Sequence, residues 1–271
     1  MTAGFFLMSA SAPIGIFDSG IGGLTVAKAV KELLPNEQII YFGDTLHLPY
    51  GEKSASSIRR YVAEISAFLK SKNCKAVLIA CNSASSVALD VTRDTLDNET
   101  IVLNVIDPLI DYVKNNFKNN TVGVIGTKAT INSNVYQDKL KEHCQVKALS
   151  TQLLAPMIEE GFINNRISST IIEEYLNNPI LEGIKALLLG CTHYPMIHNE
   201  IDRIYENSVT VLDSNTWIAL ELKKQLAMVD KLADKQEKLD EFYVSDKTDS
   251  FERSTRFFFG QAVKLKEVKL T

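Results

Sequence analysis

The chain has 271 residues, close to the length at which a single hydrophobic core gives way to two domains. Its hydrophobic content of 45% and charged content of 23% are those of an ordinary globular protein. The net charge of −4 gives no support to a nucleic-acid or acidic-membrane partner. No apolar run reaches the roughly 18 residues that would span a bilayer.

The N-terminal segment and the cysteines indicate the cellular setting. No Lys or Arg precedes Lys28, so the charged region of a secretory signal is missing, and we interpret residues 1–12 as an N-terminal extension. The cysteines form neither a C-x-x-C pair nor a zinc-type spacing, and they are too few for a disulfide framework. We therefore expect a cytoplasmic protein with reduced thiols and no bound metal.

Strands and helices alternate along the first part of the chain. Residues 14–17 predict a strand, and a glycine-rich turn leads from it into a helix that ends near Pro35. "QIIYFGD" predicts a second strand, and Ser54 can cap the amphipathic helix that follows it. "AVLIAC" predicts a buried strand and "NSASSVALDVTRDTL" a helix. This alternation predicts an α/β fold with a mostly parallel sheet.

The same order then starts again. "TVGVIGTKATINSNVYQDKLKEH" predicts strand, turn and helix, and "LLAPMIEEG" a strand end or turn that leads into a helical stretch. "ALLLGC" predicts a buried strand, and "THYPMIHNEI" enters a helix. Val122 lies 108 residues after Ile14, and Cys191 lies 110 residues after Cys81. The strand and the cysteine thus recur at nearly the same distance along the sequence, which predicts two copies of one α/β unit.

These units predict the domain organisation. We expect a first domain at 13–106 and a second domain at 107–217. The tail predicts a helix near 216–235, a strand at "EFYVSD", an amphipathic segment at "FERSTRFFFG" and a strand-like "VKLKEVKL". Because this tail is too short for a third core, we expect residues 218–271 to return to the first domain.

Two thiols occupy matching places in the two units. In open α/β sheets, ligands bind at the loops that follow the carboxyl ends of the strands. "DSGIGG", "CNSAS", "GTKAT" and "CTHYP" are such loops, and Cys81 and Cys191 begin the second and the fourth. If the units face each other, both thiols enter one cleft, where they could remove a proton from one face of a carbon and deliver one to the other. Cys74 and Cys144 lack such a setting, and we expect them to fill the core.

Such thiols need assistance, because an ordinary cysteine is only about 3% thiolate at pH 7. Asp18 ends the first strand and could serve Cys81, while His193 could serve Cys191. Their alternative roles are a turn or capping residue for Asp18 and a surface or satisfied histidine for His193. A carbanion beside a carboxylate also needs hydrogen-bond donors. The backbone of "SGIGG" and the hydroxyls of Ser19, Ser83 and Thr192 are candidates.

Two other classes of function remain open at this level. "DSGIGGLT" could be a dinucleotide fingerprint with Asp44 as the ribose acid, as in a nicotinamide dehydrogenase. However, Thr25 stands where the third glycine is expected, so the motif is weak. A thiol-bearing protein that closes on an amino acid without converting it is the other alternative. Deuterium exchange into the amino acid distinguishes an enzyme from such a binder.

The ordered motifs from Ile14 onward resemble those of glutamate racemases. They are "IGIFDSGIGGLTV", "YFGD" with "PYGEKS", "ACNSAS", "GVIGTKATI", "APMIEEG" and "LLLGCTHYP". The resemblance implies two flavodoxin-like domains with the active site between them and a cofactor-independent isomerase. That enzyme would interconvert L- and D-glutamate for peptidoglycan synthesis, with no pyridoxal, no metal, no nucleic acid and no membrane as partner. A homodimer is compatible with it. Aspartate and hydantoin racemases are the alternative within the superfamily, and aspartate racemases typically carry Glu in place of His193.

The resemblance also implies roles for individual residues. Cys81 would act on D-glutamate and Cys191 on L-glutamate, assisted by Asp18 and His193, with Glu159 supporting His193. The implied substrate contacts are Asp18, Ser19, Tyr50, Gly51, Asn82, Ser83, Thr192 and His193. The sequence departs from the family at Ser83, where Thr is common, and at Leu46-His47, where Ala-Arg is usual. We therefore assign His47 no catalytic role.

Overall fold

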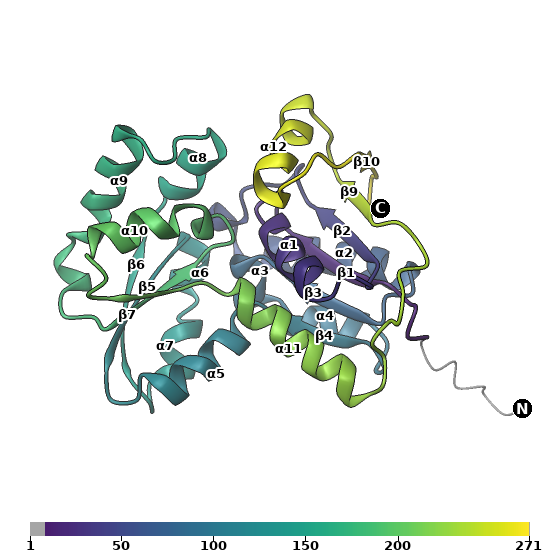
Figure 1. The fold of residues 1–271 in the computed structure, drawn as a ribbon, viewed down its shortest axis with the longest axis horizontal. Helices are drawn as coiled ribbons and strands as arrows, with labels where there is room; N and C mark the ends of the chain where they lie inside the picture. Colours follow the sequence, from purple (N-terminus) through teal and green to yellow (C-terminus); the bar gives the residue numbers. More distant parts are fainter. Residues whose placement is uncertain (1–8, 271) are drawn as a thin grey trace, which may run out of the picture.

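Two parallel β-sheets form the framework of the protein (Figure 1). The computed structural model describes residues 9–270; residues 1–8 of the predicted N-terminal extension lie outside this range. The first sheet has the order β10-β9-β2-β1-β3-β4, with β1 Ile14–Asp18, β2 Ile39–Gly43, β3 Ala76–Ile79, β4 Ile101–Asn104, β9 Glu241–Val244 and β10 Leu265–Glu267. The second has the order β6-β5-β7-β8, with β5 Thr121–Gly126, β6 Gln145–Ser150, β7 Ala186–Gly190 and β8 Thr210–Leu212.

Helices flank both sheets, as Figure 1 shows. Those of the first part of the chain are α1 Leu24–Leu33, α2 Ala55–Ser71, α3 Asn82–Val87, α4 Leu89–Thr95 and α5 Asp107–Asn116. The next are α6 Lys128–Asn132, α7 Val135–Leu140, α8 Leu154–Glu159, α9 Arg166–Leu176 and α10 His198–Ile204. The last two are α11 Asn215–Met228 and α12 Asp249–Phe259. Within residues 9–270, no helix has the length and apolar character needed to cross a membrane.

The two sheets repeat one arrangement. The order β2-β1-β3-β4 of the first sheet recurs as β6-β5-β7-β8 in the second. The strand register agrees as well, because Ile14 pairs with Ala76 and Val122 pairs with Ala186. The predicted α/β fold of two pseudo-symmetric units is therefore confirmed. As a consequence, β3 and β7 hold equivalent positions, and the loops that follow them are equivalent too.

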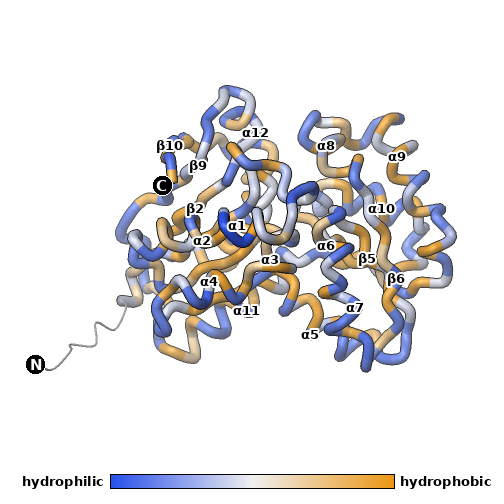
Figure 2. Tube along the Cα trace, turned by 180° about the vertical axis from the view of Figure 1, so that it is seen from behind, coloured by the Kyte–Doolittle hydropathy of each residue, from blue (hydrophilic) through white to orange (hydrophobic). Residues whose placement is uncertain are grey.

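The strands at the centre of each sheet are apolar because both faces are covered. All residues of β1, β3 and β7 are buried, as expected for parallel strands between two helical layers. In Figure 2, hydrophobic segments gather inside both halves and hydrophilic segments follow the outer loops. β6 is only half-buried. Its weaker apolar pattern explains why the sequence predicted no strand there.

Several predicted elements differ from the structure. The single helix expected over residues 82–96 is divided into α3 and α4 at Ala88, whose φ of −139° is not helical. "LLAPMIEEG" forms the helix α8 rather than a strand end or turn. The tail helix ends at Met228, well before residue 235, and Asp230 beyond it has a left-handed backbone. β4 and β8 are further strands that were not predicted.

The C-terminal segment lies against the first sheet. β9 pairs in parallel with β2, and β10 pairs with β9. α11 and α12 both pack on α1. The boundaries expected at 106/107 and 217/218 remain predictions, and α11 runs across the second of them.

Candidate active site

Cys81 and Cys191 line the same cavity, which has a volume of about 280 Å³. Cys81 follows β3 and precedes the first residue of α3. Cys191 directly follows β7, the equivalent strand of the second sheet. Both thiols are nearly buried, with 5% and 7% of the side chains exposed. The matching strand ends therefore bring together two cysteines that are 110 residues apart in the sequence.

Most of the other predicted site residues border this cavity as well. They are Ser19, Tyr50, Gly51, Asn82, Ser83, Glu159, Thr192 and His193. Gly20, from the "SGIGG" loop whose backbone was a candidate donor, also lines the cavity. The rest of the lining was not predicted and consists of Leu48, Pro49, Thr127, Ala155, Pro156 and Gly190. Thr127 could have been found, because its loop "GTKAT" follows β5 at the sheet edge where ligands were expected.

A chain of hydrogen-bonding groups runs from Cys191 to Glu159. The Sγ of Cys191 lies 3.5 Å from Nδ1 of His193, and Nε2 of His193 lies 2.8 Å from Oε1 of Glu159. Burial disfavours a charged imidazole, but Cys191 and Glu159 outweigh it and raise the pKa of His193 well above its usual value. The arrangement therefore favours an imidazolium beside Cys191, which stabilises a negative charge on that sulfur.

Cys81 has different surroundings. Its Sγ donates a hydrogen bond to Oγ of Ser19 over 3.6 Å. Burial and the negative charge of Asp18 raise the pKa of Cys81 to about 12, although hydrogen bonds from Ala84 and Ser19 oppose the shift. Cys81 is therefore a protonated thiol at neutral pH in this structure, while Cys191 has a cationic partner.

Asp18 is fully buried beneath the glycine-rich loop that follows β1. Its Oδ2 accepts hydrogen bonds from the N–H groups of Gly20 at 3.0 Å and Gly23 at 3.1 Å. Burial raises its pKa, while His193 and the backbone donors lower it. Its Oδ1 has no hydrogen-bond partner among residues 9–270. These hydrogen bonds agree with the alternative role of Asp18 as a turn or capping residue. Its assistance to a thiol stays a prediction.

Hydrogen bonds of cavity-lining residues join the two halves of the chain. Oγ of Ser83 lies 2.8 Å from Oγ1 of Thr127, and Nδ2 of Asn82 donates to the Tyr136 hydroxyl over 3.1 Å. Gly51 packs so closely on Thr127 that a Cβ there would come within 2.7 Å of it. Asn82 and Ser83, both predicted site residues, are therefore also positioned by the second half.

Tyr50 borders the cavity, but its hydroxyl is committed to a carboxylate. It donates to Oδ2 of Asp44 over 2.5 Å, and Ser245 donates to Oδ1 of the same carboxylate over 2.7 Å. Nδ1 of His47 lies 3.0 Å from Oδ1 of Asp44, and the His47 ring stacks on Tyr61. These contacts are consistent with a structural role for His47. Asp44 is buried and fully engaged, so the dinucleotide alternative loses the acid it needs for a ribose. Nowhere in residues 9–270 do three or more His, Cys, Asp or Glu side chains cluster in a way that could hold a metal ion.

The chain matches known proteins over nearly its whole length. Residues 23–222 match the family model described as Asp/Glu/Hydantoin racemase. The chain is 40% identical to a protein named glutamate racemase from Chlorobaculum tepidum, over 93% of this chain and 94% of that one.

Two crystal structures extend the comparison. A glutamate racemase from Francisella tularensis in complex with D-glutamate superposes with a TM-score of 0.89 at 38% identity, covering 96% and 98% of the two chains. A glutamate racemase from Thermus thermophilus in complex with β-chloro-D-alanine gives 0.87 at 33% identity, over 97% and 98%. The chain therefore belongs to the Asp/Glu/Hydantoin racemase family and stands with the glutamate racemases in it.

Proposed function

We propose that the protein interconverts L- and D-glutamate by moving a proton at the α-carbon between Cys81 and Cys191. The observation that carries this proposal is the shared cavity, which both thiols reach from equivalent strand ends. A substrate carbon held between them has one sulfur on each face. The relatives named glutamate racemase support glutamate as the substrate.

The chemistry balances in two steps. The Cys191 thiolate takes the α-proton of L-glutamate and becomes a thiol, and the electron pair of the broken C–H bond stays on the substrate as a carbanion. The Cys81 thiol then gives its proton to the opposite face, which forms D-glutamate and leaves a Cys81 thiolate. The reverse reaction starts from that thiolate. The assignment of Cys191 to the L-enantiomer follows the family resemblance.

The charges around the two thiols favour the conversion of L-glutamate to D-glutamate in the protein without substrate. The raised pKa of His193 keeps a positive charge next to Cys191, and the raised pKa of Cys81 keeps that thiol protonated. A protonated Cys81 and a cation beside Cys191 form the arrangement that proton abstraction from L-glutamate by Cys191 requires. Before another L-glutamate reacts, protons must return to Cys81 and leave Cys191, and Ser19 and His193 are the groups in contact with them.

Neutral donors would bind the substrate carboxylates. The cavity presents the hydroxyls of Ser19, Ser83, Thr127 and Thr192 and the amide of Asn82. Donors aimed at the α-carboxylate stabilise the charge that spreads onto it as the carbanion forms, which is the largest energetic requirement of this reaction. Donors at the other end would select the length of the substrate, and thus glutamate over aspartate.

The proposed role is to supply D-glutamate for peptidoglycan synthesis in the cytoplasm, without a cofactor. The test is to incubate the purified protein with each glutamate enantiomer in deuterated water, with a chelator present and no pyridoxal added. Both enantiomers should lose optical activity and gain deuterium at the α-carbon. If the protein racemises aspartate or a hydantoin but not glutamate, the assignment of glutamate as the substrate is wrong. If it binds glutamate without exchanging the α-proton, the proposed enzymatic activity is wrong.

A further inference from the structure

The imidazole of His193 is enclosed by four groups from separate parts of the chain. Cys191 lies at its Nδ1 and Glu159 at its Nε2. Gly22 packs against the ring, since a Cβ at that position would meet Cε1 at 2.4 Å. The ring of Phe258 completes the enclosure, with centroids 5.4 Å apart and an interplanar angle of 84°. This last contact comes from α12, in the C-terminal segment.

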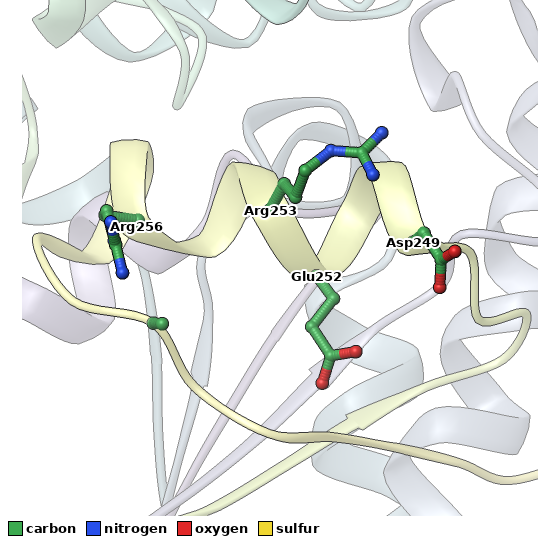
Figure 3. Close-up of a pocket in the computed structure, with 5 residues that line it drawn as sticks. Asp249, Glu252, Arg253 and Arg256 are labelled. Atoms are coloured by element: carbon green, nitrogen blue, oxygen red, sulfur yellow. The ribbon is translucent and has the colours of Figure 1, made fainter.

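α12 has two distinct faces. Thr255, Phe258 and Phe259 form its buried face, and Phe258 is only 2% exposed. The charged residues Asp249, Glu252, Arg253 and Arg256 border an open hollow of about 560 Å³. Figure 3 shows that Arg253 and Glu252 leave the helix in opposite directions. The contact to His193 therefore belongs to the apolar packing of α12 and not to its charged surface.

The two hydrogen-bonding groups do not by themselves hold the histidine ring. The ring is joined to the backbone through Cβ, and rotation about its Cα–Cβ and Cβ–Cγ bonds would move both nitrogens away from Cys191 and Glu159. Groups packed beside the ring must prevent that rotation, and Phe258 and the backbone of Gly22 occupy this position. An aromatic ring also packs favourably against an imidazolium.

We propose that Phe258 is a positioning residue for the Cys191 half of the reaction. It holds the His193 ring in the orientation in which Nδ1 faces the Cys191 sulfur. The inference rests on the proposed function, because it assigns Phe258 to one of two proton transfers. Cys81 bonds to Ser19 and does not share this contact, so its proton transfer should be unaffected.

The test compares two variants of one helix in the full-length protein. Phe258→Leu removes the ring beside His193. Phe259→Leu is the matched control, because Phe259 is 5% exposed and packs edge-on against Phe242, with centroids 5.2 Å apart. Both variants lose a buried aromatic ring from α12, so their losses in Tm should be similar. Phe258→Leu should lower kcat by roughly tenfold or more, with KM little changed, because misplaced catalytic groups cost about that much or more. Phe259→Leu should stay near the wild-type kcat.

Isotope effects separate a positioning role from a merely structural one. If proton transfer at Cys191 becomes slow, the primary deuterium isotope effect should rise with [2-²H]-L-glutamate, whose deuteron goes to Cys191. It should fall with [2-²H]-D-glutamate, whose deuteron goes to Cys81 in a step that no longer limits the rate. Equal changes for the two enantiomers, or the same pattern in Phe259→Leu, would overturn the proposal.

A measurement on the histidine itself does not depend on turnover. The chain has four histidines, so the ring signals can be assigned by NMR with a His193→Gln variant. Loss of Phe258 should loosen the contacts that raise the pKa of His193, and this pKa should fall toward its ordinary value in Phe258→Leu only. An unchanged pKa would overturn the positioning role. If the wild type racemises no glutamate, the proposed function fails instead, and the NMR comparison still decides whether Phe258 holds His193.

Discussion

The hydroxyl of Thr25 donates a hydrogen bond to the backbone carbonyl of Thr192 over 3.1 Å. Thr25 lies in the first turn of α1, and Thr192 directly follows Cys191. This bond joins the start of α1, directly after the glycine-rich loop of the first half, to the loop that carries Cys191 in the second. The position of Cys191 and His193 therefore depends on residues of both halves.

Gly22→Ala should test that dependence. A methyl group at this position would meet the His193 ring at 2.4 and 2.6 Å and Oγ1 of Thr192 at 2.8 Å. The ring must move by a sizeable fraction of an ångström, and we expect kcat/KM to fall by about 100-fold. Circular dichroism should show an unchanged secondary structure. Wild-type kinetics in this variant would contradict the close approach of the two loops.

Cys81→Ser and Cys191→Ser should each reduce racemisation by at least about 10²–10⁴-fold, the usual contribution of one acid or base. Each variant should still exchange the α-proton of one enantiomer with deuterated water, because one thiol remains. Polarimetry and NMR measure the two processes separately. Cys144→Ala is the control, since Cys144 is buried away from the cavity lining. Full activity in either serine variant would contradict the two-thiol assignment.

Glu159→Gln should shift the pH dependence of the reaction. Glu159 raises the pKa of His193, so the imidazolium persists to a higher pH than in an ordinary histidine. Without the carboxylate this pKa falls, and the alkaline limb of the kcat/KM profile should move to lower pH. The Glu159–His193 pair should stabilise the fold fully at pH values below about 6.5, the pKa of a histidine in the unfolded chain. This contribution should be lost as the pH rises through the raised pKa of His193 in the folded protein. The Tm difference between the two proteins should therefore narrow at alkaline pH.

Lys128→Glu should weaken the capture of an anionic substrate. Nζ of Lys128 lies 3.4 Å from Oε2 of Glu52, and the neighbours of these residues, Thr127 and Gly51, line the cavity. Because both side chains are half-exposed, the pair should contribute at most about 1 kcal/mol to stability. We expect a lower kcat/KM at low ionic strength and recovery as salt is added.

The matched control for that variant is Lys70→Glu. Lys70 pairs with Asp97 over 2.8 Å at a similar exposure, and neither residue borders the cavity. Lys70→Glu makes the same change in net charge, but in the last turn of α2. An equal loss of kcat/KM in both variants would show that the overall charge, and not Lys128, attracts the substrate.

Lys75→Met should destabilise the protein strongly. Nζ of Lys75 lies 2.6 Å from Oε2 of Glu37, and both side chains are buried. Removing one partner leaves an unpaired buried charge, so we expect the free energy of unfolding to fall by about 3–5 kcal/mol. Urea denaturation measures this loss. The double variant Lys75→Met/Glu37→Leu should recover much of it, and a larger loss in the double variant would contradict the explanation.

The sequence by itself determined the repeated α/β pattern and the two matched thiols. An apolar run indicates a buried segment, and a glycine-rich stretch indicates a turn, without reference to distant residues. For this reason β1, β3, β5 and β7 were predicted from their own residues. The similar offsets of Val122 and Cys191 then predicted the duplication. The candidate site followed, because parallel sheets place their loops at one edge.

Only the tertiary structure decided which distant residues meet at that site. The contact of Phe258 with His193, the hydrogen bond of Thr25 to Thr192 and the partnership of Ser83 with Thr127 each join segments far apart in the chain. A hydrophobic period shows that a side chain is buried but not which side chain it touches. Hydrogen bonds between loops also depend on how whole sheets and helices pack, and the local sequence does not contain that information.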